Sequence, residues 1–262
     1  MQYTIKQKPE QGGSARPGKR LEDSTMDYNN YDRGYAEPSM NASDYMTRTY
    51  RWMASGLLIT FAMAYITATT QLIYLVDSLY FVLTIAELAL VFVLSSRVQN
   101  MSVDAARATF FGYALLNGMV LSYYFIVFSV GTLVMAFLAT AVYFGLMAVY
   151  GTTTHKDLTG WGPKLMGGLV ALIVCGLVGG LFSLFGFGFG IMDLVLCAVG
   201  LLIFMGLTAY DTQKLQQMYA YYAGDPELAE KASIYGALTL YLDFINIFLY
   251  VVRLLGNNRR RN

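Results

Sequence analysis

The stretch LTLYLDFINIFLYVV, residues 238–252, lies in an apolar segment long enough to cross a membrane, yet it carries an aspartate, Asp243, near its middle. A carboxylate near the centre of a bilayer costs on the order of 2.5–3.5 kcal/mol, so neighbouring segments must supply its partners. On a helix, Asp243, Asn246 and Tyr250 fall close to one face, while the remaining faces are apolar. We therefore expect this segment to be surrounded by other helices.

The chain after residue 51 has the composition of a membrane protein. Of all 262 residues, 56% are hydrophobic and only 13% are charged, whereas an ordinary soluble domain carries about 25% charged residues. Apolar runs of about 20 residues, the length that crosses the hydrocarbon core, recur to the end of the chain. We predict an all-α polytopic membrane protein, a seven-transmembrane-helix bundle with the last helix central, whose spans are 52–73, 79–96, 106–128, 132–150, 165–185, 192–213 and 233–255.

Both ends of the chain differ from this bundle. Residues 1–48 are polar and lack any apolar run, so we expect a disordered N-terminal tail without a signal peptide. Residues 49–258 form the predicted seven-helix transmembrane domain, and residues 259–262 form a basic C-terminal end. Lysines and arginines gather in the loops of one side, which predicts a cytoplasmic N-terminus. Seven crossings would place the basic end outside, so either it is tolerated there or the seventh segment does not cross simply.

Few residues offer metal, nucleophile or cofactor chemistry. The two cysteines, Cys175 and Cys197, fall in apolar spans and are expected to be buried, and the only histidine, His155, lies in a predicted loop. This argues against a zinc site and a Ser–His hydrolase, and we expect no catalytic residues, no cofactor and no nucleic-acid partner. Gly176 and Gly180 stand at a GxxxG spacing, which predicts close helix packing.

The most informative ionisable residues within the spans or at their ends are Glu87, Arg97, Asp211 and Asp243. Intramembrane carboxylates commonly mark ion or proton pathways. Two carboxylates that approach one another in a dry site cannot both ionise at low cost, so such a pair would share a proton near neutral pH. Once ionised, the pair would attract a cation such as Arg97 or a metal ion, and carboxylates, backbone and water would together make a weak calcium site, with Asp211 and Asp243 as its candidate ligands. Glu87 and Asn246 are assigned to the ion pathway.

Structural roles also remain open for three of these residues. Asp211 could pair with Lys214 at the membrane interface, Glu87 could be a hydrogen-bonded structural residue, and Arg97 could anchor the cytoplasmic end of its span. Asp243 has no comparable structural explanation.

Two motifs resemble the Bax inhibitor-like family, the transmembrane BAX-inhibitor-motif (TMBIM) proteins. They are AYDTQKL, residues 209–215, and ALTLYLDFINIFLYVVRLLG, residues 237–256. The resemblance implies a seven-helix bundle with a pH-dependent calcium leak. By motif it implies that Asp211 and Asp243 are the pH sensor and gate. It also implies that Arg97 latches to Asp211 in the closed state and that Glu87 lines the ion route.

We therefore predict a pH-sensitive calcium leak channel, and not an enzyme, with calcium as the transported ion, in the inner membrane of a bacterial cell. Low pH would neutralise the aspartate pair and release Arg97, whereas higher pH would restore the latch. A regulatory membrane protein that modulates a membrane protease or another membrane-protein partner is the first alternative. An intramembrane aspartyl protease is the second, because Tyr210 and Asp211 match its YD motif, although LYLD stands where GxGD is required.

Overall fold

The described part of the chain is a bundle of long helices without any strand. The computed structural model describes residues 41–184, 190–222 and 224–259. Its helices are α1 (Ala42–Thr69), α2 (Leu72–Arg97), η2 (Val98–Asn100), α3 (Val103–Val127), α4 (Val130–Thr153), η3 (Thr159–Trp161), α5 (Gly162–Leu184), α6 (Gly190–Tyr222) and α7 (Pro226–Arg259). Within these residues, seven helices are long and apolar enough to cross a membrane. The predicted all-α, seven-helix class is confirmed.

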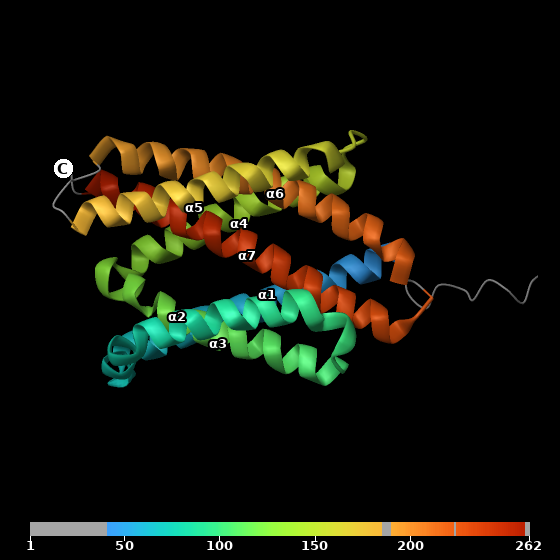
Figure 1. The fold of residues 1–262 in the computed structure, drawn as a ribbon, viewed down its shortest axis with the longest axis horizontal. Helices are drawn as coiled ribbons and strands as arrows, with labels where there is room; N and C mark the ends of the chain where they lie inside the picture. Colours follow the sequence, from blue (N-terminus) through green and yellow to red (C-terminus); the bar gives the residue numbers. More distant parts are fainter. Residues whose placement is uncertain (1–40, 185–189, 223, 260–262) are drawn as a thin grey trace, which may run out of the picture. The chain divides into compact units, whose positions relative to one another are not determined.

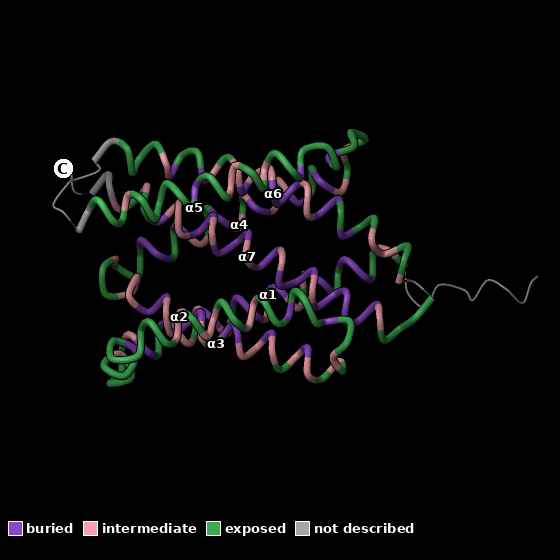
Figure 2. Tube along the Cα trace, in the orientation of Figure 1, coloured by how far each residue is buried: buried purple, intermediate pink, exposed green. Residues whose placement is uncertain are grey.

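The last helix, α7, occupies the centre of the bundle. Figure 1 shows it running between α1, α2 and α3 on one side and α4, α5 and α6 on the other. It packs against α1, α3, α4 and α6, and half of its membrane-spanning window is buried, the largest share of any span described. Figure 2 shows the same contrast, with buried positions along α7 and exposed ones along much of α2 and α5. A central helix can carry polar groups because its neighbours replace lipid.

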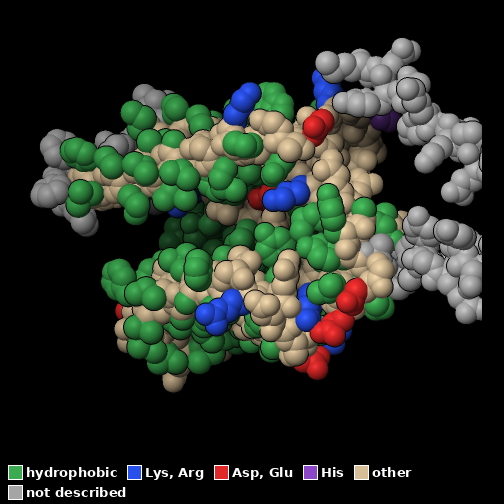
Figure 3. Space-filling model, turned by 45° about the vertical axis from the view of Figure 1, so that its right-hand side comes forward, with side chains coloured by type: hydrophobic (Ala, Val, Ile, Leu, Met, Phe, Trp, Pro, Cys, Tyr) green, Lys and Arg blue, Asp and Glu red, His purple; other side chains and the backbone are tan. Residues whose placement is uncertain are grey.

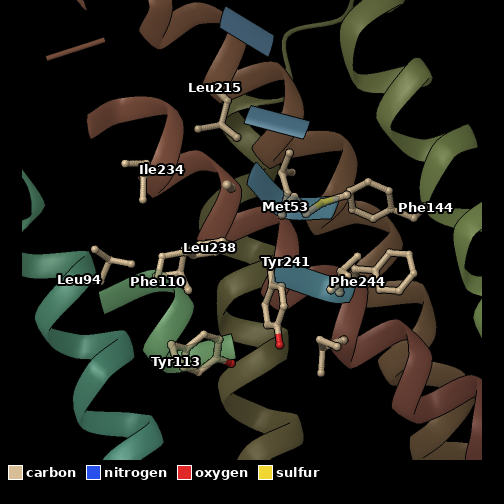
Figure 4. Close-up of a cluster of buried hydrophobic side chains, with 14 of the residues drawn as sticks. Met53, Leu94, Phe110, Tyr113, Phe144, Leu215, Ile234, Leu238, Tyr241 and Phe244 are labelled. Carbon is tan, nitrogen blue, oxygen red and sulfur yellow. The ribbon is translucent and has the colours of Figure 1, made fainter. Parts of the chain in front are cut away.

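Aromatic side chains on α7 form the core of the bundle. In Figure 4, Tyr241 and Phe244 extend from α7 toward side chains of α3 and α4. The Tyr241 ring lies 5.4 Å from the ring of Tyr113, and the Phe244 ring lies 5.7 Å from that of Phe144. Edge-on aromatic pairs at such distances contribute about 0.5–1.5 kcal/mol each beyond their buried area. These contacts fix the rotation of α7 about its own axis.

The outer surface of the bundle is apolar. Figure 3 shows hydrophobic side chains over most of the visible face, with charged side chains scattered among them. Large side chains of the outer helices point away from the core, including Phe81 (82% exposed), Phe92 (72%) and Leu177 (70%). A soluble protein rarely exposes a continuous apolar surface of this kind, whereas lipid solvates it. The protein is an integral, multi-pass membrane protein.

The first seven residues of helix α1, 42–48, fall within the predicted N-terminal tail. The side chain of Asn41 accepts a hydrogen bond from the backbone N–H of Asp44 at 2.8 Å, which caps the helix. Tyr45 and Met46 are buried in the core, and this burial stabilises the first turn. The predicted disorder therefore does not extend over residues 42–48. Residues 1–40 and 260–262 lie outside the described part of the chain.

The segment between the sixth and seventh predicted spans, residues 214–232, is almost entirely helical where the structure describes it. Helix α6 continues to Tyr222, and α7 already begins at Pro226. The carboxylate of Asp225 accepts hydrogen bonds from the N–H groups of Glu227 and Leu228 at 2.9 and 3.1 Å, and proline suits the first helical position. Hydropathy marks only the part of a helix that contacts lipid, so it missed these extensions.

The predicted basic loops gather at one end of the bundle. In Figure 1 the connections α2–α3, α4–α5 and α6–α7 lie at the right-hand end, together with the start of α1. The C-terminal end of α7 lies at the opposite end. This arrangement follows from seven helices that alternate in direction.

Candidate functional site

A cavity of about 470 Å³ between α5, α6 and α7 contains both predicted aspartates. Asp211 reaches it from α6, and Asp243 and Asn246 reach it from α7. Its remaining lining is mostly apolar, from Met166, Leu169, Leu172, Ile173, Phe204, Leu207 and Leu242. The predicted polar stripe of α7 thus meets the face of α6 that carries Asp211.

Asp243 is the most buried carboxylate of this site. Its exposed fraction is 4%, and its Oδ2 atom has no hydrogen-bond partner among the described residues. Asp211 lies close enough for the two charges to interact, and the hydroxyl of Thr208 lies beside Asp243 as well. A buried polar atom without a partner costs about 1–3 kcal/mol, more when it is charged. Two ionised carboxylates at this site would therefore be costly.

Two glycines bring α6 and α7 close together on either side of the aspartates. A Cβ atom at Gly200 would meet the ring of Tyr250 at 2.4 Å, and one at Gly236 would meet the side chain of Leu215 at 2.9 Å. Because α6 and α7 approach so closely at both places, their side chains between these contacts face one another. This packing positions Asp211 opposite Asp243.

Asn246 lines the cavity, but part of its side chain is already hydrogen-bonded within α7. Its amide donates a hydrogen bond to the carbonyl of Leu242 at 2.8 Å, one turn earlier on α7. The amide oxygen leaves an acceptor one turn beyond Asp243. Among the described residues, no group of three or more His, Cys, Asp and Glu side chains could hold a metal ion. Any calcium site here would therefore be weak and would need carbonyl or water ligands.

Glu87 belongs to a different polar layer. Its carboxylate accepts a hydrogen bond from the amide of Asn117, whose Oδ1 accepts one from the hydroxyl of Tyr241 at 3.0 Å. The same hydroxyl lies 2.6 Å from Oγ1 of Thr60. Tyr241 precedes Asp243 by two residues and so faces the opposite side of α7. Glu87 is thus hydrogen-bonded to the centre of the bundle but does not line the aspartate cavity.

Arg97 lies at the exposed end of α2, away from Asp211. Gln99, two residues later, donates a hydrogen bond to the hydroxyl of Tyr222 at 3.3 Å. Tyr222 is separated from Asp211 by about three turns of α6, or about 16 Å of helix rise. Among the described residues, no ion pair joins Arg97 to Asp211. The conformation described here does not contain the expected latch.

Lys214 is the cation that interacts with Asp211 in this structure. Its ammonium also lies 5.7 Å from the centre of the Tyr210 ring. The interfacial pairing of Asp211 with Lys214 is therefore compatible with its position in the cavity.

Of the two cysteines, Cys197 is buried as expected, whereas Cys175 is exposed on α5, because that helix turns a wide face outward.

Sequence reasoning missed Glu230, a buried carboxylate near the start of α7. It forms ion pairs with Arg48 of α1 and with Arg107 of α3, the latter at 2.9 Å. The sequence contained a sign of this earlier helix start. After Glu230, apolar residues recur at alternating spacings of four and three residues, as on one face of a helix, and the structure buries them. This stripe, at positions 230, 234, 237, 241, 244 and 248, shows that the helix begins well before the apolar span.

Residues 42–260 match the protein family described as Inhibitor of apoptosis-promoting Bax1. The chain belongs to this family. A Deinococcus radiodurans protein is 44% identical over 82% of this chain and 90% of its own. The inner membrane protein YbhL of Escherichia coli K12 is 38% identical over 85% of this chain and 95% of its own. The family match covers all seven helices, and the resemblance to the Bax inhibitor-like family found in the sequence is confirmed.

Proposed function

We propose that this protein is a pH-sensitive calcium leak channel in which Asp211 and Asp243 form the sensor and gate. One observation carries the proposal: a buried, hydrogen-bond-deficient carboxylate faces a second carboxylate inside a cavity of a membrane bundle. Protonation of the pair removes net charge from an apolar site, and deprotonation creates it, so the stability of this packing depends on pH.

In the proposed cycle, low pH neutralises the pair and favours the leak. At higher pH Asp211 ionises and recruits a cation, with Arg97 as the proposed latch and the path closed. Because Arg97 lies near the far end of α6 in this structure, the latch requires the end of α2 to approach Asp211. The described conformation corresponds to the unlatched state of the proposal.

We also propose that the protein works in a bacterial inner membrane with its N-terminus in the cytoplasm. The relative YbhL is named an inner membrane protein. The connections that carry basic residues lie at the same end of the bundle as the start of α1, which fits the positive-inside rule.

The test is calcium flux into liposomes that contain an entrapped indicator, measured from about pH 5 to about pH 8, across the range in which interacting buried carboxyl groups titrate. Wild type is compared with Asp211→Asn and Asp243→Asn. Each substitution keeps the size of the side chain but replaces a carboxyl group that can ionise by an amide that cannot. Asp104→Asn is the matched control, because that side chain is 91% exposed at the start of α3. We expect both cavity variants to lose the pH dependence and the control to keep it. Unchanged flux profiles in both cavity variants would refute the gate.

Arg97→Ala tests the latch separately. If Arg97 closes the path, its removal raises the resting flux near the upper end of the pH range and leaves the low-pH flux unchanged. Equal resting flux in the variant and the wild type would remove Arg97 from the mechanism while leaving the aspartate pair in place.

A further inference from the structure

A second cavity, of about 430 Å³, opens between α4, the α4–α5 connection, α5 and α6. Its lining has two parts. One part is apolar and consists of Met147, Leu165, Leu202 and Met205. The other part is polar or aromatic and consists of Tyr150, Lys156, Asp157, Trp161 and Tyr210. The cavity therefore combines an apolar floor with an amphipathic rim, at the end of the bundle that holds the basic connections.

Cations surround the rim of this cavity. Lys156 lines it directly, and the ammonium of Lys164 lies 5.4 Å from the centre of the Trp161 ring. Lys214 stands over the ring of Tyr210, another lining residue, at 5.7 Å. All three lysines are exposed, and so is much of Trp161. One lysine thus lines the rim, and two more stand against rings that line it, on three different elements of the chain.

One carboxylate, Asp157, also lines the cavity, but it is engaged with its own loop. It accepts a hydrogen bond from the backbone N–H of Thr159 at 2.8 Å, and hydrogen bonds from Thr159 lower the pKa of this carboxyl group. Asp157 is therefore ionised at neutral pH, and three lysines outnumber it. The balance of charge at the rim remains positive.

The α4–α5 connection is held in place by one buried amide. The side chain of Gln213 accepts a hydrogen bond from the N–H of Leu158 at 2.8 Å and donates one to the carbonyl of Lys156 at 2.9 Å. Both ends of the amide are thus used, and Gln213 is only 9% exposed. Glycine also lets α5 start directly on α6, because a Cβ atom at Gly162 would meet the Tyr210 ring at 2.5 Å. The cavity is preformed and does not depend on a ligand to order its wall.

We propose that this cavity binds an anionic phospholipid. The headgroup phosphate would lie among the three lysines, and the upper part of an acyl chain would lie on the apolar floor. Tyrosine and tryptophan rings are typical of the membrane interface, and basic pockets between membrane helices suit acidic headgroups. A water-soluble anion would leave the floor uncovered, and a zwitterionic lipid would leave the positive charge unbalanced. The proposal rests on the lining and the charges of this cavity and does not rest on calcium transport.

Tryptophan fluorescence provides a direct test, because the chain has only two tryptophans. A Trp52→Phe background leaves Trp161, at the rim, as the sole reporter. The protein is reconstituted in vesicles that mix phosphatidylcholine and phosphatidylglycerol, with bromine on the acyl chains of one lipid at a time. Bromine quenches tryptophan on contact, so the two series give the affinity of the site for one lipid relative to the other.

We expect brominated phosphatidylglycerol to quench Trp161 at a lower mole fraction than brominated phosphatidylcholine. Lys156→Gln and Lys214→Gln should each reduce that preference about fivefold, the change expected for one basic residue near an anionic lipid. Arg51→Gln, which removes an exposed cation of α1 at the same end of the bundle, is the matched control and should leave the preference unchanged.

Three results would overturn the proposal. Equal quenching by both lipids would mean that the cavity does not select anionic headgroups. An equal loss of preference in Arg51→Gln would assign the effect to general surface charge. Loss of the preference on addition of water-soluble glycerol phosphate would assign the site to free phosphate and not to a lipid. None of these readouts involves calcium flux.

Discussion

The ion pairs of Glu230 allow a quantitative test of why α7 begins so far before its apolar span. The Glu230 side chain is 10% exposed and contacts Arg48 and Arg107, so it joins α7 to α1 and α3. Removing one member of a buried ion pair typically costs about 3–5 kcal/mol. Here the arginine side chains are 44% and 41% exposed, so water can solvate them once the carboxylate is gone. We therefore expect Glu230→Gln to lower the free energy of unfolding by only about 2 kcal/mol.

The matched control is Asp104, an exposed carboxylate that pairs with Arg107, one of the two arginines that contact Glu230. Asp104 lies 3.3 Å from Arg107, and its side chain is 91% exposed. An exposed pair of this kind contributes on the order of 0.5 kcal/mol. Asp104→Asn also replaces a carboxylate by an amide with the same loss of charge and leaves the same arginine behind, so the difference between the two variants isolates the effect of burial of the carboxylate.

Thermal unfolding in detergent measures both variants. Cys197 is buried, so a thiol-reactive fluorescent dye reports unfolding once Cys175, which is exposed, has been replaced by alanine. For a chain of this size, about 2 kcal/mol corresponds to a decrease of about 4–8 °C in Tm, and the control should shift by about 1–2 °C. A decrease in Asp104→Asn as large as that in Glu230→Gln would refute the reasoning, since burial would then contribute nothing.

Two further predictions concern the packing around α7 and α6. Tyr241→Phe removes the hydroxyl that donates a hydrogen bond to Asn117 at 3.0 Å, so it should lower the free energy of unfolding by about 1–2 kcal/mol in the same assay. The control is Tyr221→Phe, which should have no effect because Tyr221 is 84% exposed. Gly151→Ala would place a Cβ atom 2.3 Å from the carbonyl oxygen of Ala209, so it should reduce the yield of monodisperse protein in size-exclusion chromatography. Gly145→Ala is the control and should leave this yield unchanged, because Gly145 has open space around it.

Local periodicity explains why both aspartates could be predicted to face the interior of the bundle. The rotation of a helix fixes which residues share a face, so Asn246 and Tyr250 had to lie with Asp243, and Phe204 and Leu207 with Asp211. A buried charge then required both faces to point inward. The pairing of the two carboxylates with one another came from the family motif, because helix periodicity does not show which faces of two helices meet.

Contacts between distant segments could not be predicted in the same way. Arg97 was assigned by motif, but its position depends on which turn of α6 meets the end of α2, and the contact of Gln99 with Tyr222 decides this. The GxxxG spacing of Gly176 and Gly180 predicted close helix packing, and this prediction was wrong, because both glycines have open space around them. Close packing occurs instead at glycines outside this motif, such as Gly151 and Gly200. A short motif shows that a close approach is sterically allowed, but the partner helix decides whether it occurs.

The two polar layers of α7 indicate which part of the bundle can move when the aspartates titrate. Tyr241 and Glu230 tie α7 to α1 and α3 through hydrogen bonds and ion pairs, and Tyr241 also reaches α2 through Asn117. On the other side, α5 packs mainly against α6, and only 6% of its membrane-spanning window is buried. A displacement of α7 would break all the former contacts, and a displacement of α6 would break its close packing on α7 at Gly200 and Gly236, whereas a displacement of α5 would mainly open the cavity around Asp243. We therefore expect a change in charge at the aspartates to move α5 away from a fixed α6 and α7.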